Sequence, residues 1–190
     1  MEPQKNINLT YVGNYLPRQC GISYFTQHLM TTLAATQTKF NHQINAEVVA
    51  VNHGGAYLYP KEVKQVIERS NRDHYISSAA YINRTADICI LQHDHASFGG
   101  QEGDHILELT DRLEVPLLVV LHSVFETPNE VQRNIVRQLA QRSHFLVVMS
   151  QTARRFLHQA YQIAHHRIRV IAHGAPDLPR SNRGFLREKL

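Results

Sequence analysis

The sequence has little of what small secreted proteins and membrane proteins need. It contains only two cysteines, Cys20 and Cys89, which are too few for the disulfide framework of a small secreted domain. Its first residues lack the basic and apolar regions of a signal peptide, and no stretch approaches the roughly 18 consecutive apolar residues that suggest a membrane helix. Internal repeats and low-complexity tracts are also missing. These absences predict a soluble, cytoplasmic protein in a reducing compartment.

The usual phosphate-binding and nucleophile motifs are missing as well. No glycine-rich segment ends in GKS or GKT, as a nucleoside-triphosphate P-loop does, and Gly13 and Gly21 do not have the spacing of the dinucleotide fingerprint. No serine lies in the nucleophile elbow of an α/β hydrolase. Kinase-like, dehydrogenase-like and serine-hydrolase readings therefore have no motif to support them.

What the chain of 190 residues does have is a regular alternation of apolar runs and amphipathic stretches, with 43% apolar residues. The apolar runs predict strands at residues 7–12, 46–51, 86–91, 117–121, 145–149 and 168–171. The intervening stretches predict helices at residues 21–35, 73–84, 102–113, 129–142 and 152–161. Residues 53–71 are ambiguous, and we interpret them as an extra strand rather than a helix. The pattern predicts an α/β fold: a doubly wound, mainly parallel Rossmann-like sheet with helices on both faces.

The net charge of +4 is unevenly distributed. Residues 141–190 contain nine of the 20 Lys and Arg residues but two of the 16 Asp and Glu residues. This basic quarter is either a solvated face and tail or a patch for phosphates or a peripheral contact with anionic membrane. Aromatic residues are not interleaved with the basic ones as in single-strand binders, so we expect no nucleic-acid partner.

In an open parallel sheet, ligands bind beyond the carboxyl ends of the strands, and the unusual residues follow the predicted strands. His122 ends the apolar run PLLVVL and is the best candidate for an acid, a base or a hydroxyl ligand, or else it caps the next turn. Cys20 lies at a helix start, where its thiol is either reactive or a small packing group. Gly99, Gly100 and Gly103 precede a helix and form either an anion-binding loop or a simple turn.

A cluster of His93, Asp94 and His95 contains metal-ligand residue types, with His105 and His122 as further candidates. We expect, however, that the side chains of His93 and His95 point to opposite faces of an extended segment. We therefore expect no metal site.

Five segments occur in a fixed order: LPRQCGISYFTQHL, YINRTADICILQHDHASFGGQEGDHILEL, VPLLVVLHSVFETPNE, VVMSQTARRFL and IRVIAHGAPD. Together they resemble the amino-terminal domain of the retaining glycosyltransferases of family 4, which have the GT-B fold. The resemblance covers roughly residues 7–178. The chain departs from the family wording at residues 94–97, in the approach to the glycine loop, and at Ala172, where proline is common. The first departure bears on acceptor preference.

The resemblance implies half of a two-domain enzyme. Residues 1–178 correspond to the Rossmann-like acceptor-side domain and residues 179–190 to the start of an interdomain linker or tail. A second, carboxyl-terminal Rossmann-like domain, in cis or in trans, would bind most of a nucleoside-diphosphate sugar. The implied reaction transfers a glycosyl group to a sugar acceptor with retention of configuration and without an obligate metal or other cofactor, and we expect little activity from this chain alone.

The resemblance also assigns roles to single residues. The catalytic candidate that reaches toward the reacting sugar is His122. The candidates for binding acceptor or donor are Arg18, Cys20, Gly21, Gly99, Gly100, Glu102, Gly103, Ser123, His173 and Gly174. Two other hypotheses stay open from the sequence: a non-catalytic module that binds a glycan, a phosphorylated metabolite or a partner chain, and a metal-dependent hydrolase built on residues 93–95.

Overall fold

The apolar runs form the strands of one parallel sheet. The structure is a computed structural model that describes residues 5–36 and 42–174. Its strands are β1 (Lys5–Gly13), β2 (His42–Asn52), β3 (Val63–Glu68), β4 (Ile88–His93), β5 (Leu117–Leu121), β6 (Phe145–Val148) and β7 (Ile168–Val170). They lie in the order β3-β2-β1-β4-β5-β6-β7, and every neighbouring pair is parallel. The predicted Rossmann-like α/β fold is confirmed.

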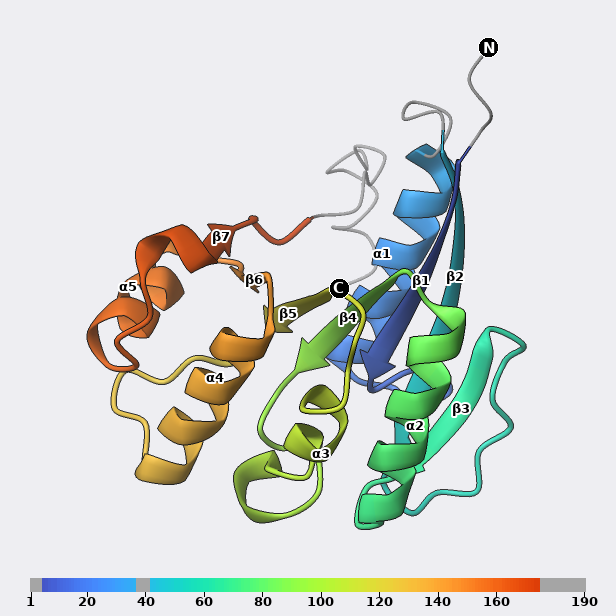
Figure 1. The fold of residues 1–190 in the computed structure, drawn as a ribbon, viewed down its shortest axis with the longest axis horizontal. Coiled ribbons are helices and arrows are strands. Elements are labelled where there is room, and N and C mark those ends of the chain that lie inside the picture. Colours follow the sequence, from blue (N-terminus) through green and yellow to red (C-terminus); the bar gives the residue numbers. More distant parts are fainter. Residues whose placement is uncertain (1–4, 37–41, 175–190) are drawn as a thin grey trace, which may run out of the picture.

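The helices cover the two faces of this sheet unequally (Figure 1). They are α1 (Gly21–Thr36), α2 (Arg72–Thr85), α3 (Ile106–Thr110), α4 (Glu130–Arg142) and α5 (Gln151–Gln159). Successive strand residues point to opposite faces and so enter two separate cores. Val119 and Leu121 of β5 pack in the core under α2 to α5, whereas Val120 packs in the smaller core that includes Met30 of α1.

The strand order reverses between β1 and β4. The chain runs from β1 outward to β2 and β3, then returns through α2 to β4 and continues in the other direction. At such a switch point the turns after the two central strands diverge, and ligands bind in the crevice between them. The topology therefore places the turn after β1 and the turn after β4 side by side at the carboxyl edge of the sheet.

The structure confirms the predicted strand within residues 53–71 but not the helix predicted over residues 102–113. The ambiguous segment contains a strand, β3, as we interpreted it. The helix predicted over residues 102–113 is mostly wrong: a 3-10 turn occupies Gln101–Gly103, and α3 spans only Ile106–Thr110. The physical reason is the backbone of this loop, because Gly100, Glu102 and Gly103 all have positive φ angles, which an α-helix does not tolerate.

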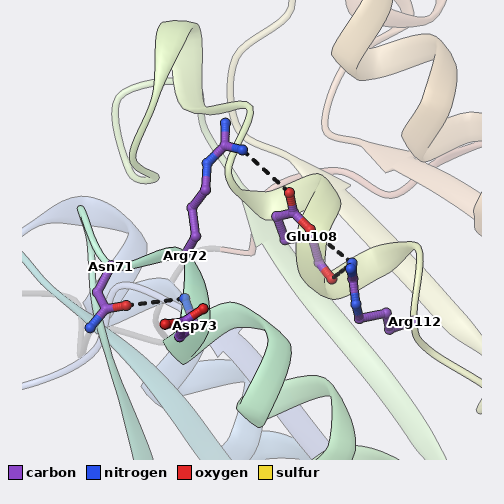
Figure 2. A network of polar contacts seen from close by, with 5 residues as sticks. All are labelled: Asn71, Arg72, Asp73, Glu108 and Arg112. Atoms are coloured by element: carbon purple, nitrogen blue, oxygen red, sulfur yellow. Dashed lines mark hydrogen bonds and ion pairs between the residues drawn. The ribbon is translucent and has the colours of Figure 1, made fainter.

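The short helix α3 is tied to α2 by a polar network (Figure 2). Glu108 of α3 accepts hydrogen bonds from Arg112, at 2.8 Å, and forms an ion pair with Arg72 at 3.5 Å. At the start of α2, the side chain of Asn71 accepts a hydrogen bond from the backbone N–H of Asp73. Exposed pairs of this kind contribute little energy, about 0 to 1 kcal/mol each, so the packing of α3 beside α2 rests mainly on the apolar core that both helices share.

Some expectations fall beyond the part of the chain that the structure describes. The proposed boundary at residues 178 and 179, the linker at 179–190 and the basic residues in that stretch lie outside the described residues. Within residues 5–36 and 42–174, none of the helices combines the length and the apolar character required to span a bilayer.

Candidate functional site

The turns at the carboxyl edge of the sheet are linked by buried side chains. The amide of Asn14, after β1, donates a hydrogen bond to Ser97 Oγ in the turn after β4 at 2.9 Å. The carbonyl oxygen of the same side chain lies 3.0 Å from His53 Nε2, after β2. Burial first, and then the charges of Arg18 and Arg69, lower the pKa of His53 to about 4, so the ring is neutral and donates to Asn14. Asn14 thus joins three turns into one surface.

The glycine loop after β4 is closely packed rather than open. A Cβ on Gly99 would lie 1.9 Å from the carbonyl oxygen of Arg69, and one on Gly103 would lie 2.7 Å from the carbonyl oxygen of His95. The hydroxyl of Tyr75 connects the same segments, because it donates to the Arg69 carbonyl and accepts from the Gly99 N–H. Gly99 therefore serves the packing of the loop, and it is not among the residues that line the pocket described below.

Glu102 is held in place by the start of α4. Its carboxylate accepts hydrogen bonds from Asn129 Nδ2 and Gln132 Nε2, each at 2.9 Å. These hydrogen bonds, from Gln132 first, lower the pKa of Glu102. Its φ of 54° is unusual for a residue with a side chain. The carboxylate is therefore ionised and oriented at neutral pH, with lone pairs left for a further donor.

Four of the predicted site residues line a single pocket of about 360 Å³: Gly100, Glu102, Gly103 and Ser123. The other lining residues are Arg69, Asp94, His95, Ala96 and Phe125. The volume lies near the lower end of the range of about 300 to 1,000 Å³ that is typical of small-molecule sites. The sequence did not lead us to expect Arg69 and Phe125 at the site. Each follows a strand of the sheet, and that position is the signal that could have identified them.

His122 lies just beyond β5 and is oriented by two side chains that the sequence did not reveal. Its Nε2 lies 2.7 Å from Oε1 of the fully buried Gln92, and its ring meets the edge of Phe25 with centroids 5.0 Å apart. Burial chiefly lowers the pKa of His122 to about 4, partly opposed by Asp94. At neutral pH the ring is uncharged, so Nε2–H donates to Gln92 and Nδ1 keeps a free lone pair.

Phe25 also contacts the end of the described chain. The rings of Phe25 and His173 lie 5.3 Å apart, so one aromatic side chain of α1 touches both His122 and His173. His173 is exposed, and its Nδ1 approaches the carbonyl oxygen of Gly174 at 2.8 Å. The structure therefore brings His122 and His173 to the same side chain, as a shared site requires.

The third group of predicted residues surrounds the start of α1. Cys20 is half-buried, and its Sγ lies 3.1 Å from Ser23 Oγ. Burial raises the pKa of the Cys20 thiol, but the hydrogen bonds from Ser23 and Arg18 and the charge of Arg18 outweigh burial, so that the pKa is lowered overall. Gly21 is exposed, and a Cβ there would meet nothing within 4 Å. Arg18, Cys20 and Gly21 form an open turn that does not line the 360 Å³ pocket.

The histidine cluster after β4 differs from the sequence prediction. The expectation that His93 and His95 point to opposite faces is wrong: their rings meet edge to face with centroids 4.9 Å apart. The reason is that side chains two residues apart along an extended chain lie on the same face, and His95 comes two positions after His93, the last residue of β4. No group of three or more His, Cys, Asp or Glu side chains in the described ranges is arranged to hold a metal ion. The metal-dependent hydrolase thus has no geometric support there.

Several basic residues of the last quarter have structural contacts. Arg142 pairs with Asp111 at 3.1 Å, and Arg167 donates to the backbone carbonyls of Ala140 and Ser143. The guanidinium of Arg169 lies 4.1 Å from the ring centre of Phe145. Arg142 thus connects the end of α4 to the end of α3, Arg167 connects the segment before β7 to the end of α4, and Arg169 packs β7 against β6.

Comparison with known proteins gives structural neighbours only. No family model matches the sequence, and no curated protein matches it. A glycosyltransferase from Rickettsia africae ESF-5 superimposes with a TM-score of 0.59 at 16% identity, over 97% of this chain and 49% of that one. An α-glucosyltransferase solved with UDP and a 13-mer DNA superimposes with a TM-score of 0.50 at 14% identity, over 76% of this chain and 37% of that one.

The same kind of match recurs with a second structure of an α-glucosyltransferase, in complex with UDP, at a TM-score of 0.50, 12% identity and coverage of 76% and 35%. At identities this low, the superpositions show a shared fold alone. The chain spans about half the length of the Rickettsia protein and about a third of the α-glucosyltransferase. These three structures are of glycosyltransferases, and this chain shares the fold of a part of each.

Proposed function

We propose that the chain is the acceptor-side amino-terminal domain of a retaining glycosyltransferase of family 4 with the GT-B fold. In this proposal a second Rossmann-like domain, in cis or in trans, binds the diphosphate and completes the site. The observation that carries the proposal is the position of His122. A neutral, oriented imidazole follows β5, the strand that pairs with β4, and His122 matches the histidine that reaches toward the reacting sugar in the resembled enzymes.

The division of labour follows from the chemistry of glycosyl transfer. The reaction develops positive charge on the sugar and negative charge on the departing diphosphate, and both need stabilisation in a cleft from which water is excluded. On this side of the cleft, His122 accepts a hydrogen bond from a sugar hydroxyl through Nδ1. Arg18 and the open turn at Gly21 face the anionic part of the donor. The remaining cations for the diphosphate belong to the second domain.

A transfer assay tests this proposal directly. The chain is incubated with uridine- and guanosine-diphosphate hexoses and a panel of acceptors, alone and together with the Rossmann-like domain that completes it, and products are detected by mass spectrometry. We expect negligible turnover by the chain alone and turnover by the combination. The stereochemistry of the product at the anomeric carbon must match that of the donor. Robust turnover by the chain alone, or an inverted product, contradicts the proposal.

Two variants locate the chemistry. In the completed enzyme, His122→Ala is expected to reduce turnover by about 10² or more, the scale of a positioned acid, base or hydroxyl ligand, with a much smaller loss of unfolding free energy. His28→Ala is the control, because His28 is an exposed histidine of α1. Equal losses of turnover and stability in His122→Ala contradict its assignment to the site.

A second candidate function is a non-catalytic binding module. The observation that favours it is the pocket of about 360 Å³, whose lining combines the aromatic ring of Phe125 with polar residues such as Arg69 and Glu102. The reading frame after Leu190 discriminates cheaply. A following Rossmann-like domain with Lys, Arg and paired Glu residues favours the enzyme, whereas a stop codon favours the module or a split enzyme.

A further inference from the structure

The pocket beside the glycine loop contains a buried side chain without a partner. His95 is 6% exposed, and its Nδ1 lies 3.1 Å from the backbone carbonyl oxygen of Glu102. A carbonyl oxygen only accepts hydrogen bonds, so the proton of the neutral ring is on Nδ1. The other nitrogen, Nε2, is therefore an acceptor, and it has no hydrogen-bond partner within the described residues. A buried acceptor without a partner in a pocket wall indicates a ligand that donates a hydrogen bond.

The polar groups around His95 are of mixed type. Asp94 and Glu102 contribute carboxylate oxygens, which accept hydrogen bonds. Ser123 Oγ is buried and, in the part of the chain that is described, has no partner. Arg69, which lines the pocket, uses its Nε to donate to the Phe98 carbonyl, and its two terminal nitrogens are further donors. A ligand hydroxyl both donates and accepts, and it is the group that satisfies such a set.

An aromatic ring supplies the apolar side of the pocket. Phe125 is 41% exposed, and its ring stacks on that of His95 with centroids 5.7 Å apart and an angle of 24° between the planes. The stack fixes the ring at the pocket wall and leaves part of it free. Sugars and cyclic polyols have one face of C–H groups that packs on aromatic rings, while their edges carry hydroxyls.

The charge of the pocket excludes one class of alternatives. Its wall contains one cation, Arg69, and two carboxyl groups, Asp94 and Glu102. The hydrogen bonds to Glu102 lower its pKa and keep it ionised. A phosphate or carboxylate ligand would meet two negative groups at short range, which disfavours it. A neutral ligand does not meet this repulsion.

We propose that this pocket is a subsite for a neutral sugar or cyclic polyol, with the ring face on Phe125 and hydroxyls bound by His95 Nε2, Asp94 and Arg69. The subsite deepens the proposed function, on which its role as acceptor site rests, because the pocket adjoins His122 through Ser123. Asp94 and His95 of the subsite lie in residues 94–97, where the sequence departs from the pattern of the family. Binding itself requires no transfer and no second domain.

Saturation-transfer NMR on the chain alone tests the subsite. The probes are D-glucose, D-mannose, D-galactose and myo-inositol, with glucose 6-phosphate and inorganic phosphate as anionic comparisons. We expect at least one neutral probe to bind, with its ring C–H protons closest to the protein, and to bind more tightly than either anion. No binding by any neutral probe, or tighter binding of the anions, overturns the proposal.

Matched variants assign the binding to these residues. Phe125→Ala is expected to weaken the affinity of the bound probe tenfold or more, and Phe125→Tyr to retain it. Tyr24→Ala is the control, because Tyr24 is a similarly exposed aromatic residue, at 43%, that lies outside this pocket. His95→Gln, whose side-chain oxygen replaces the acceptor, should retain more affinity than His95→Leu. Affinity that is unchanged in both Phe125→Ala and His95→Leu overturns the proposal.

The outcome is separable from that of the transfer assay. Binding that depends on Phe125 and His95, without transfer by the completed protein, supports the subsite and contradicts the glycosyltransferase proposal. Transfer without such binding does the reverse. The thermal midpoint of each variant, measured alongside, shows whether a loss of binding comes from unfolding.

Discussion

The turns after β1 and β4 both contain glycines, yet they have different physical properties. In the turn after β4, a Cβ on Gly99 or Gly103 would approach backbone carbonyl oxygens to 1.9 Å and 2.7 Å. In the turn after β1, a Cβ on Gly21 would have nothing within 4 Å. The turn after β4 is closely packed at its glycines, whereas the end of the turn after β1 is open at Gly21. A glycine-rich segment in a sequence therefore does not by itself mark a ligand-binding loop.

The largest expected effect at neutral pH is on the packed turn. Gly99→Ala forces a methyl group against the carbonyl oxygen of Arg69 and separates Gly99 from Tyr75. Overpacking of this kind typically costs about 1 to 3 kcal/mol, and we expect the upper end because the obstacle is backbone. Urea unfolding measures the loss. A change below about 0.5 kcal/mol, the size of a neutral surface substitution, would mean that the turn is not packed as described.

The next effect depends on pH and concerns His93, at the entrance to the packed turn. Burial first, and then His95 and His122, lower the pKa of His93 from 6.5 to about 3. Because the fold favours the neutral ring, its stabilisation is complete above pH 6.5 and is lost as the pH falls toward 3. The loss approaches about 1.4 kcal/mol per pH unit for this one group.

The measurement compares two unfolding series across this pH range. His93→Gln should be less stable at neutral pH but should lose stability less steeply on acidification than the unmodified chain. His28→Gln should leave the slope unchanged, because His28 is exposed. Parallel slopes for His93→Gln and the unmodified chain would show that His93 takes up its proton equally in the folded and unfolded states.

A smaller effect is expected at Asn129, which bonds to Glu102 in the turn after β4. Asn129 is the N-cap of α4, accepts from the Gln132 N–H, and donates to Glu102 at 2.9 Å. Loss of an N-cap costs about 1 kcal/mol, and Asn129→Ala loses the bond to Glu102 as well. Ser150→Ala is the matched control, since Ser150 caps α5 by accepting from the Ala153 N–H. Thermal unfolding should show the larger loss of stability for Asn129→Ala. Equal losses for the two variants would show that the hydrogen bond from Asn129 to Glu102 adds no stability.

The smallest effect belongs to the open turn. Gly21→Ala adds a methyl group to an exposed position at the first residue of α1, so the change in unfolding free energy should stay within about 0.5 kcal/mol. If the turn receives the donor in the completed enzyme, the same substitution raises the KM for the nucleotide sugar. A large loss of stability would instead place Gly21 in the packing and remove the contrast between the two turns.

The sheet was predictable because its signal is local. Runs such as PLLVVL are buried on both faces, and only a parallel strand between helix layers makes such a run favourable. The position of His122 followed from the same run, since the residue that ends a strand lies at the edge of the sheet. The helix predicted over 102–113 failed because periodicity does not register the positive φ angles at Glu102 and Gly103, which depend on contacts with α4 and the His95 backbone.

The partners of the site residues were not predictable from one sequence. Phe25 and Gln92 lie far from His122 along the chain, and Asn14 lies far from Ser97. Nothing in the local sequence pattern of these residues indicates the contacts. Their alternation or helical spacing indicates only that they face inward. The fold determines which inward-facing residues meet, so the pocket at Arg69 and Phe125 could be assembled only from the three-dimensional arrangement.

The outer strands of the sheet have a consequence for the behaviour of the protein at high concentration. An uncovered edge strand presents unpaired backbone groups to which another sheet can add, which is a route to aggregation. The edge strand β7 has only three residues, and Arg169 at its centre is exposed. The opposite edge strand, β3, carries exposed Lys64. Short length and outward charge oppose edge-to-edge growth, so concentrated solutions should resist fibril formation through either side of the sheet.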